Sequence, residues 1–176
     1  MMSGMRDRST HLDALIEGYD SPPDDAEERV RSLSVLRAWQ LALETKDLAG
    51  LEALMHEDIV IDLPFSESGR TESGFFRVYQ GIPECLDFWR VAFQFEKQLH
   101  PFTEMELFVS PDGSRIFFEG QGHVTMTTGA EYRNRYVLRI DLDDGRVRHY
   151  REYYNPIISA FAFGRPIAGQ LKLDRL

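Results

Sequence analysis

The sequence predicts an α+β fold with its helices first and a strongly curved, mainly antiparallel sheet after them. Between residues 26 and 46, apolar side chains recur at three- and four-residue spacing, which is the period of an amphipathic helix. In the second half, strand-like runs alternate with short turns that contain Gly and Asp. One run holds Gly120 and Gly122, and glycines inside a strand indicate a bend. A bent sheet closed by helices forms a cone around a cavity.

Three helices are predicted in the first half of the chain. The long helix spans residues 26–46, and a short one follows over 47–55 with Asp47 as its N-cap. A third begins at Pro83, because proline favours the first turn of a helix. These helices must cover one face of the sheet.

Six strand-like runs and a closing apolar segment complete the domain. The runs are Ile59–Leu63, Phe75–Tyr79, Met105–Val109, Arg115–Thr127, Tyr132–Leu142 and Val147–Tyr154. The last four are joined by tight turns and predict an antiparallel meander. Segment 157–163 follows Pro156 and is expected to form a docking turn or a closing helix. The predicted organisation is a flexible tail over 1–23, one domain over 24–168 and a second tail over 169–176.

Composition limits the possible functions. The chain has 176 residues, of which 43% are apolar, so it can bury the core of a single domain. Its formal charge of -9 argues against nucleic acid as a partner, because nucleic acid is held chiefly by neutralising phosphates. No apolar run approaches the roughly 20 residues that cross a bilayer, and the N-terminus lacks the apolar stretch of a secretory signal. We therefore expect a soluble, cytoplasmic protein with no membrane partner.

Two segments resemble a known family. They are Glu131-Tyr132-Arg133-Asn134-Arg135-Tyr136-Val137 and Arg151-Glu152-Tyr153-Tyr154-Asn155-Pro156. Together with the upstream order of a long helix, a short helix, a strand start at 57–60 and a Trp-bearing helix, they resemble the SnoaL-like branch of the nuclear transport factor 2-like superfamily. Within it, the phenazine biosynthesis A/B group is the most similar, since Glu119–His123 also resembles one of its segments.

The resemblance implies a cone-shaped α+β domain, often a homodimer packed through its sheets, with a pocket on the concave face. Members include ketosteroid isomerases, polyketide cyclases, epoxide hydrolases, dehydratases and phenazine condensing proteins, and many others only bind ligands. In the phenazine group, the glutamate that matches Glu152 is the acid/base and is assisted by a helix histidine. Phe88 stands at or near that histidine position here.

Glu152 is the leading catalytic candidate from the residues themselves as well. Strand alternation puts it on one face with Tyr150 and Tyr154, and a carboxyl group between aromatic rings is expected to have a raised pKa. A carboxyl group that titrates near neutrality can move protons beside a carbonyl. The alternative is a structural salt bridge to Arg148, Arg151 or an arginine on the neighbouring strand.

Two further acid/base candidates are His123 and Asp62. His123 alternates with Glu119 and Gln121 along one strand, and either this face or the opposite one lines the cavity. Asp62 interrupts an apolar strand, so it either points into the pocket or lies outward on an edge strand.

Other side chains are expected to shape the pocket. Tyr132, Asn134 and Tyr136 share a strand face and can donate hydrogen bonds to a carbonyl, or serve the sheet itself. Phe88 and Trp89 on the third helix are expected to pack the core and to reach the cavity wall. The five histidines show no metal-ligand spacing and no dinucleotide fingerprint is present, so the predicted site has neither metal nor cofactor.

Two functional hypotheses follow. The first is a small cofactor-independent enzyme that isomerises, cyclises, dehydrates or condenses an apolar carbonyl compound through Glu152, aided by His123 or Asp62. The second is a non-catalytic domain that binds a small hydrophobic ligand or a partner through its sheet. Glu152 separates them: catalysis needs it in a cavity without a firm cationic partner, whereas a binding module predicts it tied to an arginine.

Overall fold

The computed structural model describes residues 10–65 and 69–166. Part of the predicted N-terminal tail and all of the predicted C-terminal tail lie outside these ranges. Six strands form one sheet with the order β2-β1-β6-β5-β4-β3. Their bounds are β1 Met55–Leu63, β2 Arg77–Gln80, β3 Glu96–Val109, β4 Arg115–Met126, β5 Glu131–Asp143 and β6 Arg146–Tyr154.

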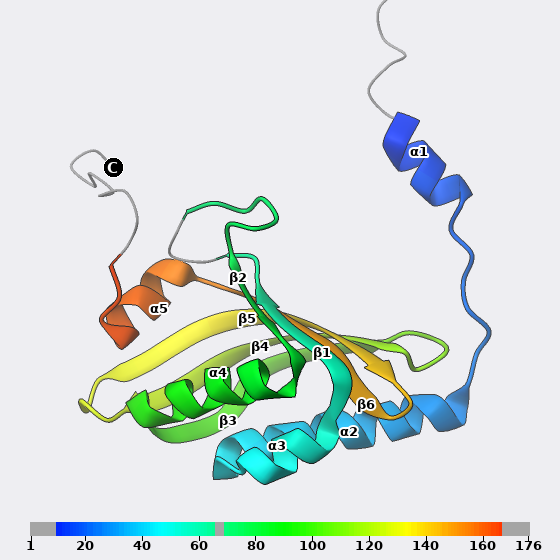
Figure 1. Cartoon of the computed structure of the whole chain (residues 1–176). Coiled ribbons are helices and arrows are strands. Elements are labelled where there is room, and N and C mark those ends of the chain that lie inside the picture. The colour runs from blue at the N-terminus through cyan, green and yellow to red at the C-terminus, as the bar shows by residue number, and fades with distance from the viewer. Residues whose placement is uncertain (1–9, 66–68, 167–176) are drawn as a thin grey trace, which may run out of the picture.

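The sheet is a four-strand meander extended by two earlier strands, as Figure 1 shows. Strands β3 to β6 pair antiparallel in chain order, which confirms the predicted meander. β1 then joins β6 in parallel and carries β2 on its outer edge. The sheet curves around helices on one face, and the α+β cone is confirmed.

Helices α2 (Ala26–Thr45) and α3 (Leu48–Leu54) form as predicted. Asp47 caps α3 by accepting a hydrogen bond from the Gly50 amide at 2.9 Å. The buried stripe of α2 runs from Ser32 through Trp39 to Leu43, and Val30 is exposed. Ser32 faces inward because its hydroxyl donates to the Gly113 carbonyl at 2.7 Å, so the polar position anchors the helix to the β3–β4 turn.

The largest difference from the predicted elements lies after α4 (Gly81–Phe95). Strand β3 begins at Glu96, nine residues before the predicted start at Met105. Its first half contains His100 and Pro101 and lacks a clear alternation, but pairing with β4 stabilises it as a strand. A tertiary contact therefore overrides weak local preference here.

The core lies between the concave face and helices α2, α3 and α4. Cys85 is fully buried in it, and burial raises the pKa of its thiol to about 11. Helix α5 (Pro156–Phe163) is the predicted closing helix and lies across one end of the cone.

One helix falls inside the predicted tail. α1 (Thr10–Glu17) stands away from the domain in Figure 1, and its side chains from Leu12 onward are exposed. None of the helices in the described ranges is long and apolar enough to span a membrane.

Candidate functional site

A cavity of about 110 Å³ opens between the concave face of the sheet and helices α2, α4 and α5. Its walls are mostly aromatic and aliphatic, with Glu152, Glu96, Arg77 and Arg165 as the charged residues. A second hollow of about 240 Å³ adjoins it and shares the lining residues Arg77, Phe88, Ala92 and Arg165. The inner cavity is of the size that accepts a single ring, and the outer hollow leaves room for a longer ligand.

Glu152 lies on β6 and lines the inner cavity together with Tyr150 and Tyr154, the two neighbours that share its strand face. Its Oε2 accepts a hydrogen bond from the Tyr150 hydroxyl at 3.1 Å. Burial raises the pKa of Glu152 to about 7, against the lowering effects of that hydrogen bond and of the Arg77 charge. Among the described residues, no arginine or lysine forms an ion pair with this carboxylate.

Glu96 is a second acid on the cavity wall, at the junction of α4 and β3. Burial raises its pKa, while the charge of Lys46 lowers it. The charge of Glu96 in turn raises the pKa of Glu152. Two carboxyl groups thus share an apolar cavity, and the charge of Glu96 adds to burial in disfavouring the ionised form of Glu152.

Two tyrosine hydroxyls form a hydrogen-bonded pair at the other side of the cavity. The Tyr132 and Tyr136 oxygens lie 2.9 Å apart, and burial raises the pKa of both groups, so both stay protonated. Behind them Asn134 is almost fully buried: its amide group donates to the Asn155 carbonyl at 2.9 Å and to the Tyr132 oxygen at 3.0 Å. Asn134 therefore positions a tyrosine donor rather than lining the cavity itself.

The helix side of the cavity is a cluster of rings. Phe88 and Trp89 on α4 line it, and Trp89 packs against Tyr150 with ring centroids 5.8 Å apart. Trp39 on α2 stacks on the same tyrosine at 5.7 Å. Within the described part of the chain, the buried indole N–H groups of Trp39 and Trp89 have no acceptor.

The glycine at position 122 is required by this packing. A Cβ added there would lie 2.6 Å from the Tyr136 ring and 3.2 Å from Phe102. Gly122 therefore lets both rings approach the floor of the cavity.

Asp62 lies on the opposite, convex face of the sheet, which is the outward placement of the two that the sequence left open, and it does not line the cavity. Arg151 donates to both of its oxygens, at 2.8 and 2.7 Å, and His149 Nε2 lies 3.1 Å from Oδ2. Burial alone would raise the pKa of Asp62, but the hydrogen bonds and charges of His149 and Arg151 lower it to about 2. Its environment is that of a structural ion pair.

His123 also lies on the convex face, because its strand neighbours Gly122 and Val124 line the cavity. Its Nε2 pairs with the Glu131 carboxylate. The face of β4 that carries the glycines therefore meets the cavity. His123 and Asp62 both lie on the opposite face of the sheet from Glu152.

Residues 35–150 match the SnoaL-like domain. This chain belongs to the SnoaL-like family. The curated protein YesE of Bacillus subtilis strain 168, which is uncharacterised, is 29% identical over 138 residues, covering 76% of this chain and 88% of YesE.

Solved structures extend this SnoaL-like assignment. A proposed isomerase from Bacillus subtilis superposes with a TM-score of 0.67 at 25% identity, over 81% of this chain and 99% of that one. A phenazine biosynthesis-related protein from Pseudomonas aeruginosa superposes with a TM-score of 0.64 at 18% identity, over 92% and 98% of the two chains. The predicted family and fold are confirmed.

Sequence reasoning missed Glu96 and Arg77. Glu96 follows the helix segment Phe93-Gln94-Phe95. An acid directly after these aromatic residues was the sign in the sequence that its carboxyl group could be buried. Arg77 sits on the short edge strand β2, whose pattern gave no indication that it reaches the cavity. Its Nη2 donates to the Tyr154 hydroxyl.

Proposed function

We propose that this SnoaL-like protein is a cofactor-independent enzyme that moves protons on an apolar carbonyl compound, with Glu152 as the acid/base. The observation that carries the proposal is a glutamate inside an aromatic cavity, contacted by a tyrosine hydroxyl, with its pKa raised to about 7. A group with that pKa is present in both protonation states near neutral pH, which is what a shuttle requires. The family's isomerases and cyclases perform chemistry of this class.

The geometry supports one sequence of steps. The Glu152 carboxylate removes a proton from the carbon beside the carbonyl, and the electron pair moves onto the carbonyl oxygen. The protonated Tyr132–Tyr136 pair donates a hydrogen bond to that oxygen as its charge develops. Glu152 then returns the proton at a second carbon, which completes an isomerisation. In a cyclisation, the enolate carbon instead attacks a second carbonyl group of the same molecule, and Glu152 gives its proton to the alkoxide that forms.

Glu96 and Arg77 set the balance of charge around the reacting atoms. Burial is the main cause of the raised pKa of Glu152, and the charges of Arg77, which lowers it, and Glu96, which raises it, adjust the value further. Phe88, which matches at or near the assisting histidine of the phenazine group, lines the cavity, and Glu96 is the second carboxyl group among the lining residues.

The test is a one-ring β,γ-unsaturated ketone, 3-cyclohexenone, whose isomerisation and α-proton exchange are followed by ultraviolet absorbance and by NMR in D₂O. We expect Glu152→Gln to lower the rate by 10²- to 10⁴-fold, the contribution of a positioned acid/base. The rate constant kcat/KM of the natural chain should rise with pH through about 7, because the base must be ionised.

Glu119→Gln is the matched control, since Glu119 lies on β4 and pairs with Arg135 away from the cavity. Equal rates for the natural chain and Glu152→Gln, or a Glu152 pKa at or below 4.5 by carboxyl-labelled NMR, would favour the alternative of a non-catalytic domain that binds a small hydrophobic ligand.

We also propose that the chain is a homodimer packed through the convex face. Phe108, Phe117 and Val137 are exposed there at 63%, 41% and 39%, on three adjacent strands. Light scattering should give twice 20.4 kDa, and Phe117→Glu should give one chain mass. If the natural chain is a monomer, the dimer proposal is wrong, and the proposal for Glu152 in the cavity is unaffected.

A further inference from the structure

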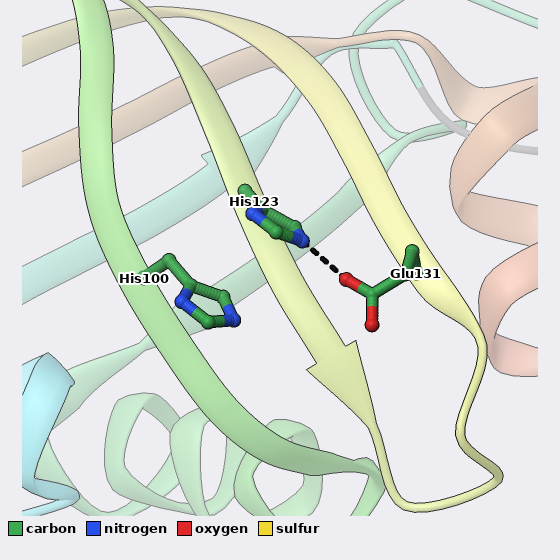
Figure 2. Close-up of side chains that lie close together, drawn as sticks. All are labelled: His100, His123 and Glu131. Atoms are coloured by element: carbon green, nitrogen blue, oxygen red, sulfur yellow. Dashed lines mark hydrogen bonds and ion pairs between the residues drawn. The ribbon is translucent and has the colours of Figure 1, made fainter.

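Three potential metal ligands meet on the convex face at the end of the sheet nearest the β4–β5 turn. Figure 2 shows His100, His123 and Glu131 on three neighbouring strands, β3, β4 and β5. His100 and His123 are direct partners in the β3–β4 register, and Glu131 is the partner of Thr125, two residues further along β4. Side chains at such positions share a face and lie within reach of one another.

The two imidazole rings are already arranged side by side. They stack with centroids 4.2 Å apart and planes 17° apart, and both are partly buried. One ligand atom from each of the two histidines and from Glu131 lies within 4.8 Å of the others. In a tetrahedral zinc site such atoms are about 3.4 Å apart, so small side-chain rotations bring the three into coordinating positions.

The remaining polar contacts suit a binding site. His123 Nε2 contacts the Glu131 carboxylate directly. The Thr125 hydroxyl lies 2.9 Å from His100 Nε2 and 3.2 Å from Glu131 Oε1, so it orients both groups. Outer contacts of this kind fix the direction of metal ligands.

We propose that His100, His123 and Glu131 form a binding site for a first-row divalent transition-metal ion such as Zn²⁺. Two neutral imidazoles and one carboxylate are the donor set that these ions favour over Mg²⁺ or Ca²⁺. Glu131 is exposed, so water has access to a fourth coordination position. The site is separate from the Glu152 cavity, because the two lie on opposite faces of the sheet.

The site is also distinct from the apolar convex patch. His123 lies six residues along β4 from Phe117, which is roughly 20 Å in an extended strand. Arg133 is the register partner of His123, so one cation neighbours the site. We expect Arg133→Gln to strengthen metal binding.

The experiment is calorimetric titration of the untagged, metal-stripped full chain with ZnCl₂ at pH 7.5. We expect one ion per chain, with affinity lowered by more than 100-fold in His100→Gln and in His123→Gln, beyond the 10- to 100-fold cost of losing an outer contact. Affinity should also be lower at acid pH, because protonated ligands cannot coordinate a metal ion. With Cu²⁺, electron paramagnetic resonance should report two nitrogen ligands.

Controls come from groups outside the cluster. His56→Gln removes a histidine near Asp143, and Glu119→Gln removes a carboxylate further along β4, so both should bind Zn²⁺ like the natural chain. Zn²⁺ should raise the Tm of the natural chain and of these controls but not of the two ligand variants. Binding that survives in the His100→Gln/His123→Gln double variant, or a natural chain whose Tm Zn²⁺ does not raise, would overturn the proposal.

Discussion

Two carboxylates on opposite faces of one sheet have pKa values displaced in opposite directions. Asp62 on the convex face pairs in register with Arg151, and its pKa falls to about 2. Glu152, the next residue along β6 after Arg151, lines the concave cavity, and its pKa rises to about 7. Both acids are removed from water, so burial alone does not decide the outcome.

The difference is the identity of the compensating partner. Asp62 is contacted by His149 and receives two hydrogen bonds from the Arg151 guanidinium, and together these partners return more stability to its charged form than burial removes. Glu152 receives one hydrogen bond from a neutral hydroxyl and has an acid, Glu96, in its surroundings. The first acid stabilises the sheet, and the ionised form of the second costs stability.

The largest expected change in stability comes from Asp62→Asn. Removing the charge leaves Arg151 and His149 without their partner, which should lower the free energy of unfolding by about 2–4 kcal/mol at pH 7. The pKa of Asp62 is lowered from 3.8 to about 2, so its stabilisation is present above pH 3.8 and is lost as pH falls through 2. Urea unfolding at pH 7 and pH 3 measures both effects.

Asp87→Asn is the control, because Asp87 forms an exposed ion pair with Arg90 on the same helix and should change stability by less than about 1 kcal/mol. Equal losses in the two variants would mean that the Asp62 cluster has no special role.

Glu152→Gln should do the reverse and stabilise the protein. The pKa of Glu152 is raised from 4.5 to about 7, so ionisation destabilises the folded state as pH rises from 4.5 and does so fully above 7. The variant should gain up to about 3 kcal/mol at pH 8 and nothing at pH 4. Thermal unfolding across this range is the measurement, and a gain that is independent of pH would contradict the assigned cause.

The smallest effects concern the neighbours of Glu152. Glu96→Gln should lower the pKa of Glu152 and Arg77→Gln should raise it, each by about one unit or less. Carboxyl-labelled NMR titration of Glu152 in both variants checks the signs. Shifts in the same direction would show that the cavity had changed shape instead.

Local sequence determined the helices, the turns and the alternation of side chains along the strands. The spacing in α2, the Asp47 cap and the turns of the meander all depend on neighbours in the chain, and each was predicted. Alternation also grouped Tyr150, Glu152 and Tyr154 correctly, because successive strand residues point to opposite faces whatever the sheet does.

Only the tertiary structure decided which face became the cavity and which distant groups meet. Alternation leaves the concave side unassigned, so His123 and Gly122 were equal candidates until the sheet curved. The partners of Asp62, the approach of Glu96 to Glu152 and the meeting of His100 with His123 all depend on register between strands far apart in sequence. Register is set by long-range pairing and burial, and these are properties of the whole fold.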